Sequence, residues 1–216
     1  MSILGIFTEE ETKKVEEELK ALKEKKLLQD TARIEEYEKQ FVEESDAKAL
    51  ATLHPIVKVM VRRTLIQGKQ AGLKFGIHMA TRTITYQDEL YHQGRTLQNG
   101  VWVITNRDLV VTNAAGGRSW HNYGLAVDFV FDGSPKPGYQ WTWDDNIDTN
   151  KDGKDDWGQV GVIAEANGLT WGGRWRPPEA PVDRPHVQYH NGVDTVSIAF
   201  TIYKLGGIES VWEKIV

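Results

Sequence analysis

Hydrophobic and polar positions divide the chain into two stretches of different character. In the first stretch, Val15, Leu19 and Leu22 recur at helical spacing among dense Glu and Lys, and no Gly or Pro interrupts residues 8–52. This stretch opens with Thr-Glu-Glu-Glu at Thr8, the pattern of a helix-capping box. The spacing predicts one long amphipathic helix or two consecutive ones.

The second stretch alternates short apolar runs with turn residues. Pro55 suits the first turn of a helix, whose apolar positions continue to Leu65 before Gly72 ends it. An apolar run over residues 73–79 then predicts a strand. The same patterns predict further helices over 87–91, 158–167 and 195–205, and strands over 126–131 and 186–189.

Short strands mixed irregularly with helices favour an α+β fold over a regular parallel βαβ arrangement. We therefore predict a small mixed sheet flanked by helices over residues 53–216, with an N-terminal helical extension over residues 1–52. The length of 216 residues suits one ordinary domain or one domain with an appendage, and the hydrophobic fraction of 40% is sufficient for a packed core.

The charge is distributed unevenly between the two stretches. Residues 1–52 hold 9 Lys and Arg against 14 Asp and Glu, so the whole net charge of −5 lies there. The remainder is balanced, which argues against nucleic acid as a partner, because phosphate binding needs a basic face. The start MSILGIFTEEE has no basic segment, and its apolar run is short. We expect no signal peptide and no membrane span.

The strongest local motif is Ser-Trp-His-Asn-Tyr-Gly-Leu-Ala-Val-Asp, from Ser119 to Asp128. On a strand, Asp128 would share a face with Ala126 and Val130 inside an apolar run. A buried, unpaired carboxylate costs several kcal/mol, so Asp128 must meet a cation, a metal or strong donors. Backbone amides or an arginine could satisfy Asp128 equally well, and His121 alone could be an ordinary hydrogen-bonded histidine.

A second motif, Asp-Arg-Pro-His, runs from Asp183 to His186. Two histidines and Asp128 would provide three ligands and leave a fourth tetrahedral position for water, as in a catalytic rather than a structural zinc site. The chain has no cysteine, so a metal site has to use His and carboxylate ligands. Because an ordinary strand would place Asp183 and His186 on opposite faces, we expect a turn between them.

These two motifs resemble the zinc D-alanyl-D-alanine carboxypeptidases and their L-alanyl-D-glutamate endopeptidase relatives. The resemblance extends from Leu53 to Val216 and is closest to the endopeptidases of bacteriophage endolysins and bacterial autolysins. Further similar blocks are Thr-Arg-Thr at Thr81, Thr-Asn-Ala-Ala-Gly-Gly at Thr112 and Trp-Gly-Gly-Arg-Trp at Trp171.

The resemblance implies roles for individual residues. It implies zinc ligation by His121, Asp128 and His186. It also implies that Asp183 is the general base and then acid, and that Arg82 binds the substrate carbonyl and stabilises the oxyanion. The substrate-binding residues expected beside these are Ser119, Gln87 and Trp171, with Gln87 more suited to supporting Arg82 and Trp175 as a second candidate wall of the cleft.

An acidic segment between the two motifs resembles a calcium-binding loop. Asp148, Asn150 and Asp152, followed by Gly153, match positions 1, 3, 5 and 6 of such a loop. The backbone carbonyl of Lys154 and the carboxylate of Asp156 could complete it. Position 12 holds Gln rather than the bidentate Glu of a tight site. The sequence leaves two interpretations open: a weak Ca²⁺ site, which some similar endolysins have at this place, or a solvated acidic turn.

Three functions remain open from the sequence. The first is a zinc endopeptidase that cuts the L-alanyl-D-glutamate bond of bacterial peptidoglycan stem peptides, in the manner of a phage endolysin that lyses its host. The second is a D-alanyl-D-alanine carboxypeptidase or dipeptidase on the same zinc framework. The third is a non-catalytic cell-wall-binding module, against which the retained Arg82, Asp183 and zinc ligands argue.

The endolysin interpretation predicts a protein that stays in the host cytoplasm until it is released to the cell wall. The first 52 residues could form a solvated helical arm or a hairpin packed on the main domain. They could also mediate dimerisation or target the wall. The sequence alone does not distinguish among these roles, and it does not identify the host or the peptidoglycan chemotype.

Overall fold

The computed structural model describes residues 36, 40–133, 141–178 and 180–216. The helical extension predicted over residues 8–52 therefore lies mostly outside the described residues. The chain divides into two compact units, Met1–Phe41 and Val42–Val216.

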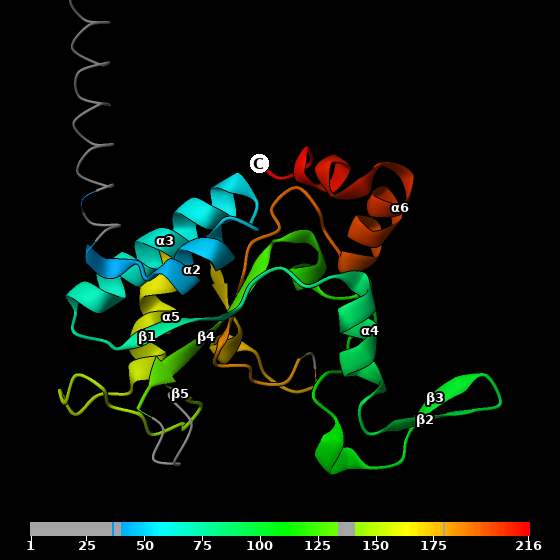
Figure 1. Ribbon diagram of the computed structural model, residues 1–216, viewed down its shortest axis with the longest axis horizontal. Helices are drawn as coiled ribbons and strands as arrows, with labels where there is room; N and C mark the ends of the chain where they lie inside the picture. Colours follow the sequence, from blue (N-terminus) through cyan, green and yellow to red (C-terminus); the bar gives the residue numbers. More distant parts are fainter. Residues whose placement is uncertain (1–35, 37–39, 134–140, 179) are drawn as a thin grey trace, which may run out of the picture. The chain divides into compact units, whose positions relative to one another are not determined.

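A five-stranded sheet forms the centre of the unit Val42–Val216 (Figure 1). Its strands follow the order β1-β4-β7-β6, with β5 paired to β4. The bounds are β1 (Phe75–Met79), β4 (Ala126–Asp132), β5 (Trp141–Thr142), β6 (Thr170–Trp171) and β7 (His186–Gln188). The α+β class is confirmed. The sheet was expected to be mixed, but every pairing among the described strands is antiparallel, because no helical crossover returns a strand parallel to its neighbour.

Three helices pack with the sheet around one hydrophobic core: α2 (Glu44–Leu50), α3 (Pro55–Gln70) and α5 (Asp156–Ala166). In the apolar face predicted for α3, Val57, Val61 and Leu65 are fully buried, whereas Ile56 and Met60 are partly buried. The His54 side chain caps this helix by accepting the Ile56 backbone N–H at 3.2 Å. Burial of such side chains contributes about 1.5–3 kcal/mol each and anchors the helix.

The folded unit extends further toward the N-terminus than residue 53. Asp46 of α2 is buried, and its Oδ1 accepts the backbone N–H of Ile77 in β1 at 2.7 Å. Its Oδ2 lies 3.2 Å from Nζ of Lys69 in α3. Leu50 belongs to the same core. Helix α2 thus ties β1 to α3, and the compact unit begins at Val42.

The remaining two helices of the described residues pack mainly on other elements. Helix α4 (Ile84–His92) contacts strand β2 (Arg95–Gln98), and α6 (Val196–Trp212) contacts the 3-10 turn at Trp120–Tyr123. Helix α4 begins three residues before the predicted position, because the Thr83 side chain caps it by accepting the Tyr86 backbone N–H. Helix α6 continues beyond the predicted end, although a kink interrupts it at Gly206 and Gly207. No helix among the described residues is long and apolar enough to cross a membrane.

A small hairpin of β2 (Arg95–Gln98) and β3 (Val101–Ile104) follows α4 and was not predicted (Figure 1). Its turn is Asn99-Gly100, and both residues have positive φ. Asn-Gly flanked by strand-forming residues is the typical two-residue hairpin signal. The Asn-Gly signal is present in the sequence, but the hairpin was not predicted because the alternation of apolar and polar residues on either side is short.

Candidate metal centre and active-site cleft

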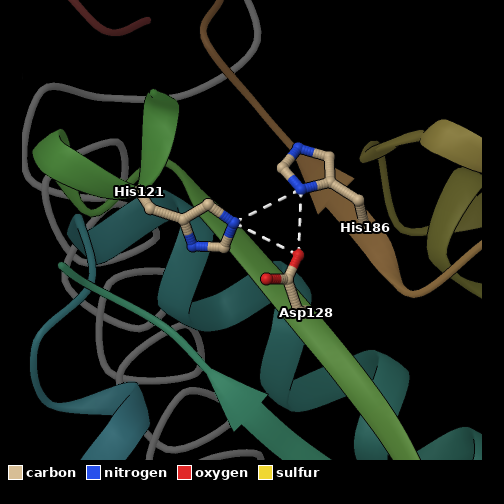
Figure 2. Close-up of side chains that lie close together, drawn as sticks. All are labelled: His121, Asp128 and His186. Atoms are coloured by element: carbon tan, nitrogen blue, oxygen red, sulfur yellow. Dashed lines mark hydrogen bonds and ion pairs between the residues drawn. The ribbon is translucent and has the colours of Figure 1, made fainter. Parts of the chain in front are cut away.

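Three separate elements bring the predicted metal ligands together. His121 lies in a 3-10 turn, η3 (Trp120–Tyr123), whereas Asp128 lies in β4 and His186 in β7. Ser119 begins the turn, and its Oγ accepts the His121 backbone N–H at 3.4 Å. In the antiparallel ladder Asp128 is directly opposite His186. Figure 2 shows the two rings and the carboxylate pointing toward one another.

The three facing atoms are close to equidistant. Asp128 Oδ1 lies 3.2 Å from His121 Nε2 and 3.0 Å from His186 Nδ1, and the two nitrogens are 3.3 Å apart. Donor atoms bound at ~2.0–2.1 Å to one tetrahedral ion lie roughly 3.3 Å apart. The spacing therefore fits a single metal ion bound by all three residues.

Hydrogen bonds on the outer side of the His121 and His186 rings determine which nitrogen carries no proton and can bind a metal ion. His121 Nδ1 donates to the Ala80 carbonyl at 2.7 Å, and His186 Nε2 donates to Gln188 Oε1 at 3.0 Å. The inner nitrogens then present lone pairs to the lone pairs of Asp128 Oδ1. Orientation of ligating histidines by a second hydrogen bond is typical of metal centres. The donor set fits a divalent metal ion.

The electrostatics of the cluster also favour a positive charge between these groups. Burial by itself would raise the pKa of Asp128, but the two histidines hold that pKa well below its usual range. Burial would likewise lower the pKa of His186, yet its hydrogen bond to Asp128 and the nearby carboxylates raise it. The carboxylate thus stays ionised and attracts a cation, which a proton on His186 or a metal ion can provide.

Arg82 lies beside the His-Asp-His cluster and holds the second oxygen of Asp128. Its Nη2 is 2.5 Å from Asp128 Oδ2, and its Nη1 donates to Gln87 Oε1 at 3.2 Å. Gln87 was expected among the substrate-binding residues, but it is completely buried. The Gln87 amide donates to the Ala114 carbonyl at 2.8 Å. Gln87 therefore supports Arg82 and cannot reach a substrate.

Asp183 reaches the cleft through the expected turn, which places Arg184 and Pro185 between it and His186. Burial raises the pKa of Asp183 above its ordinary value. The Gly172 carbonyl accepts the Asp183 backbone N–H at 3.1 Å, and a Cβ on Gly172 would lie 2.5 Å from the Asp183 carbonyl oxygen. The glycine of the Trp-Gly-Gly block is thus required for the close approach of the Asp183 loop.

The two tryptophans of that block have different positions. Trp171, expected to contact substrate, is 7% exposed, and its indole N–H donates to the Arg184 carbonyl at 2.7 Å. It packs against Gly161 and Gly173, which would clash with it if either carried a Cβ. Trp171 therefore belongs to the core. Trp175 lines the cleft instead, with its ring 5.2 Å from that of His186.

The His-Asp-His cluster opens into a cleft of about 1120 Å³. Its lining includes the three metal-facing residues together with Arg82, Ser119 and Asp183. Motif reasoning did not identify several further lining residues: Tyr86, Arg118, Trp120, Trp143 and Gln188. The cleft is large enough for a peptide segment, since small-ligand pockets occupy about 300–1,000 Å³.

The acidic loop forms a second cluster of carboxylates. Oxygen atoms of Asp148, Asp152 and Asp156 lie within 4.8 Å of one another. Asp148 accepts the backbone N–H groups of Asp152 and Gly153, and Asp152 accepts that of Lys154. Asn150 Oδ1 also accepts the Asp152 N–H, at 3.2 Å. The structure brings the predicted loop residues together.

Comparison with known proteins identifies the family. A family model described as D-alanyl-D-alanine carboxypeptidase matches residues 112–189, which contain the three metal-facing residues and Asp183. The peptidoglycan L-alanyl-D-glutamate endopeptidase CwlK of Bacillus subtilis (strain 168) is 37% identical over 143 residues, 66% of this chain and 77% of CwlK. The chain belongs to this peptidase family.

Membership of the D-alanyl-D-alanine carboxypeptidase family makes the protein a metallopeptidase, in agreement with its His-Asp-His cluster. Two solved structures are also similar. The L-Ala D-Glu endopeptidase ChiX of Serratia marcescens matches with a TM-score of 0.42 and 21% identity, covering 66% of this chain and 84% of ChiX. The LD-carboxypeptidase LdcB matches with a TM-score of 0.43 and 16% identity, covering 76% of this chain and 70% of LdcB.

Proposed function

We propose that the protein is a zinc-dependent endopeptidase that hydrolyses the L-alanyl-D-glutamate bond of peptidoglycan stem peptides. The observation that carries the proposal is the convergence of three ligand atoms, 3.0–3.3 Å apart, in a cleft that also contains Asp183 and Arg82. Two imidazoles and one carboxylate are a ligand set of catalytic zinc. The 37% identity to CwlK supports the choice of bond.

The chemistry is divided among residues of this chain. A zinc ion bound by His121, Asp128 and His186 would supply Lewis acidity and lower the pKa of water toward neutrality. Asp183 would take a proton from the attacking water and pass it to the departing amine. Arg82 would stabilise the negative charge that develops on the carbonyl oxygen.

The rest of the site positions these groups. Asp128 is held between two rings and Arg82, so its Oδ1 remains directed at the metal position. Ser119 caps the turn that carries His121 and also lines the cleft, so it can contact substrate. Such preorganisation lowers the reorganisation that the reaction requires.

A D-alanyl-D-alanine carboxypeptidase is the second candidate, because the matching family model carries that description. Digestion of purified peptidoglycan followed by mass spectrometry distinguishes the two. New N-terminal D-glutamate or D-isoglutamine is the result expected from the endopeptidase. Release of D-alanine alone would establish the carboxypeptidase and overturn the proposal. The Asp183→Ala variant is the matched control, and it should release neither product.

The acidic loop supports a further proposal, that it binds Ca²⁺ weakly. The clustering of Asp148, Asp152 and Asp156 within 4.8 Å supports it, together with the resemblance to a calcium loop. Gln159 stands where a bidentate Glu would complete a tight site. We therefore expect an affinity toward the ~10⁻⁴ M end of such loops.

The resemblance to phage endolysins supports a biological role in host lysis, with the enzyme held in the host cytoplasm until it is released to the wall. Lysis of host cells after co-expression with a membrane pore would be the expected result. Continued growth under the same conditions would contradict that role without affecting the proposed bond specificity. For the residues before Val42 we propose self-association, which analytical ultracentrifugation of the full chain tests against a chain that begins at Val42.

A further inference from the structure

Arg118 is a basic side chain of the cleft that the proposed chemistry does not use. It directly precedes Ser119, which caps the turn carrying His121. The cleft is lined by two arginines, Arg82 and Arg118. Arg82 is ion-paired with Asp128, whereas Arg118 has no carboxylate partner among the residues that the structure describes.

The backbone before Arg118 is held firmly. Gly116 donates its N–H to Asp88 Oδ1 at 2.6 Å, and Arg118 donates its own to the Ala115 carbonyl at 2.9 Å. Gly117 has φ +75° and lies against the Phe200 ring, where a Cβ would come within 2.4 Å of the ring. The position of the Arg118 backbone is therefore set by the fold and does not depend on a substrate.

The side chain of Arg118 is held by α6 and retains free donors. Its Nη1 donates to Ser197 Oγ at 2.5 Å, and its guanidinium carbon lies 5.6 Å from the centre of the Phe200 ring. A guanidinium carries five N–H donors, of which Ser197 takes one. The remaining fork is suited to a carboxylate, which guanidinium groups bind in bidentate geometry.

The proposed substrate offers a carboxylate close to the scissile bond. Glutamate has two carboxyl groups, and only one of them can continue the stem peptide. The other remains ionised next to the L-alanyl-D-glutamate bond, unless amidation converts the residue to D-isoglutamine. A positively charged cleft residue can therefore distinguish these two forms of peptidoglycan.

We infer that Arg118 binds this free carboxylate and makes the enzyme prefer stem peptides with D-glutamate over those with D-isoglutamine. The inference rests on the proposed function, because it requires cleavage at that bond. It assigns Arg118 a specificity role, separate from the chemical step carried by Asp183 and Arg82. A charge-assisted hydrogen bond predicts a preference of roughly 10- to 100-fold in kcat/KM.

The test measures kcat/KM of the zinc-loaded full chain on two soluble peptides, L-Ala-γ-D-Glu-L-Lys and its α-amide. Arg118→Gln should lose roughly 10- to 100-fold on the carboxylate peptide and change little on the amide. Arg118→Lys should recover part of the preference, because it keeps the charge without the fork. Arg174→Gln is the matched control, since Arg174 pairs with Glu165 and does not line the cleft.

A binding measurement separates recognition from turnover. Calorimetry should show that the product γ-D-Glu-L-Lys binds wild type more tightly than its α-amide, and that Arg118→Gln removes this difference. Equal losses on both peptides, or no preference in wild type, would overturn the role of Arg118 and leave the bond specificity intact. If wild type cleaves neither peptide after L-alanine, the proposed function itself fails, and this inference with it.

Discussion

The two clusters that could bind a metal ion differ in how their ligand atoms are already engaged. At His121, Asp128 and His186, hydrogen bonds occupy the outer atoms of both rings and leave the inner lone pairs facing one another. In the acidic loop, the carboxylate oxygens accept backbone N–H groups of the loop itself. Asp156 Oδ2 is fully buried and accepts both the N–H and the hydroxyl of Thr149.

The His-Asp-His cluster is therefore preorganised for an ion, whereas the acidic loop has to give up hydrogen bonds to bind one. The His-Asp-His cluster lies in a sheet and a capped turn, so its geometry exists before an ion arrives. The loop carboxylates already accept hydrogen bonds from the backbone of the loop, and this lowers the free energy gained when a cation binds. We therefore expect a large dependence on metal at the first cluster and a small one at the second.

Removing either ring of the first cluster should have the largest effect. His121→Ala or His186→Ala should abolish stoichiometric metal binding and reduce turnover to background, because two ligands do not retain the ion. Metal analysis of the purified variants, alongside turnover, checks this. His92→Ala is the control, since His92 stacks on Trp102 away from the metal ligands. Full metal occupancy in both variants would show that the ion is bound elsewhere.

Replacing the base should affect turnover and leave the metal in place. Asp183→Asn should lower kcat by ~10²–10⁴-fold, the usual contribution of a general base. Burial raises the pKa of Asp183 in the metal-free protein, whereas a bound divalent cation lowers it again. Steady-state assays with metal analysis measure the loss of turnover. Near-normal turnover in the variant would assign the base to another carboxylate.

The same pKa shift predicts a change in stability of the metal-free protein. A carboxyl whose pKa is raised by folding destabilises the native state once it is ionised, so stability is lost as pH rises through the raised pKa. Asp183→Asn should therefore raise the melting temperature near neutral pH. The difference from wild type should disappear below the unfolded-state pKa of ~3.9. A lower melting temperature at neutral pH would contradict the assigned burial effect.

Loss of Arg82 should slow catalysis somewhat less. Arg82→Ala removes both the positive charge that would stabilise the oxyanion and the partner of Asp128 Oδ2. We expect kcat to fall by ~10²–10³-fold. Gln87→Ala should show a smaller loss in the same direction, because Gln87 holds the Arg82 guanidinium and does not reach the substrate itself. Steady-state kinetics with metal analysis separates the two contributions. A larger loss in Gln87→Ala than in Arg82→Ala would reverse their roles.

The first cluster should not depend on the residues before Val42. A chain that begins at Val42 should bind metal and cleave soluble stem peptides as the full chain does. A chain that begins at Leu53 loses Asp46 and Leu50, and should melt at lower temperature, because removing a buried leucine costs about 2–5 kcal/mol. Thermal melts and zinc titration of both chains provide the measurement. Loss of metal binding in the chain that begins at Val42 would show that the residues before Val42 belong to the domain core.

Calcium at the acidic loop should have the smallest effect. Millimolar Ca²⁺ should raise the melting temperature of wild type slightly, by mass action at an affinity near ~10⁻⁴ M. Asp148→Ala/Asp152→Ala should remove that shift, and Mg²⁺ should do less than Ca²⁺, because it requires a stricter octahedron. Calorimetry at fixed zinc measures the binding. The absence of both heat and melting shift would make the loop a polar turn.

The sequence identified His121, Asp128 and His186 as candidate metal ligands because each stands in a short motif that resembles the family, and the structure brings their side chains together. A carboxylate in an apolar strand and a histidine after Asp-Arg-Pro need only short-range patterns to be noticed. Arg118 and Asp46 were missed, because their roles depend on Ser197 and Ile77, far away in the chain. Trp171 was placed in the cleft because a tryptophan is equally common in cores and sites, and only packing distinguishes the two.

The most direct test of the metal centre is an anomalous difference map at the zinc edge, from crystals of the zinc-loaded protein. A single peak is expected at ~2.0–2.1 Å from His121 Nε2, His186 Nδ1 and Asp128 Oδ1. A zinc peak bound by other residues, or its absence from a protein that is fully active, would contradict the assignment of this cluster as the catalytic centre.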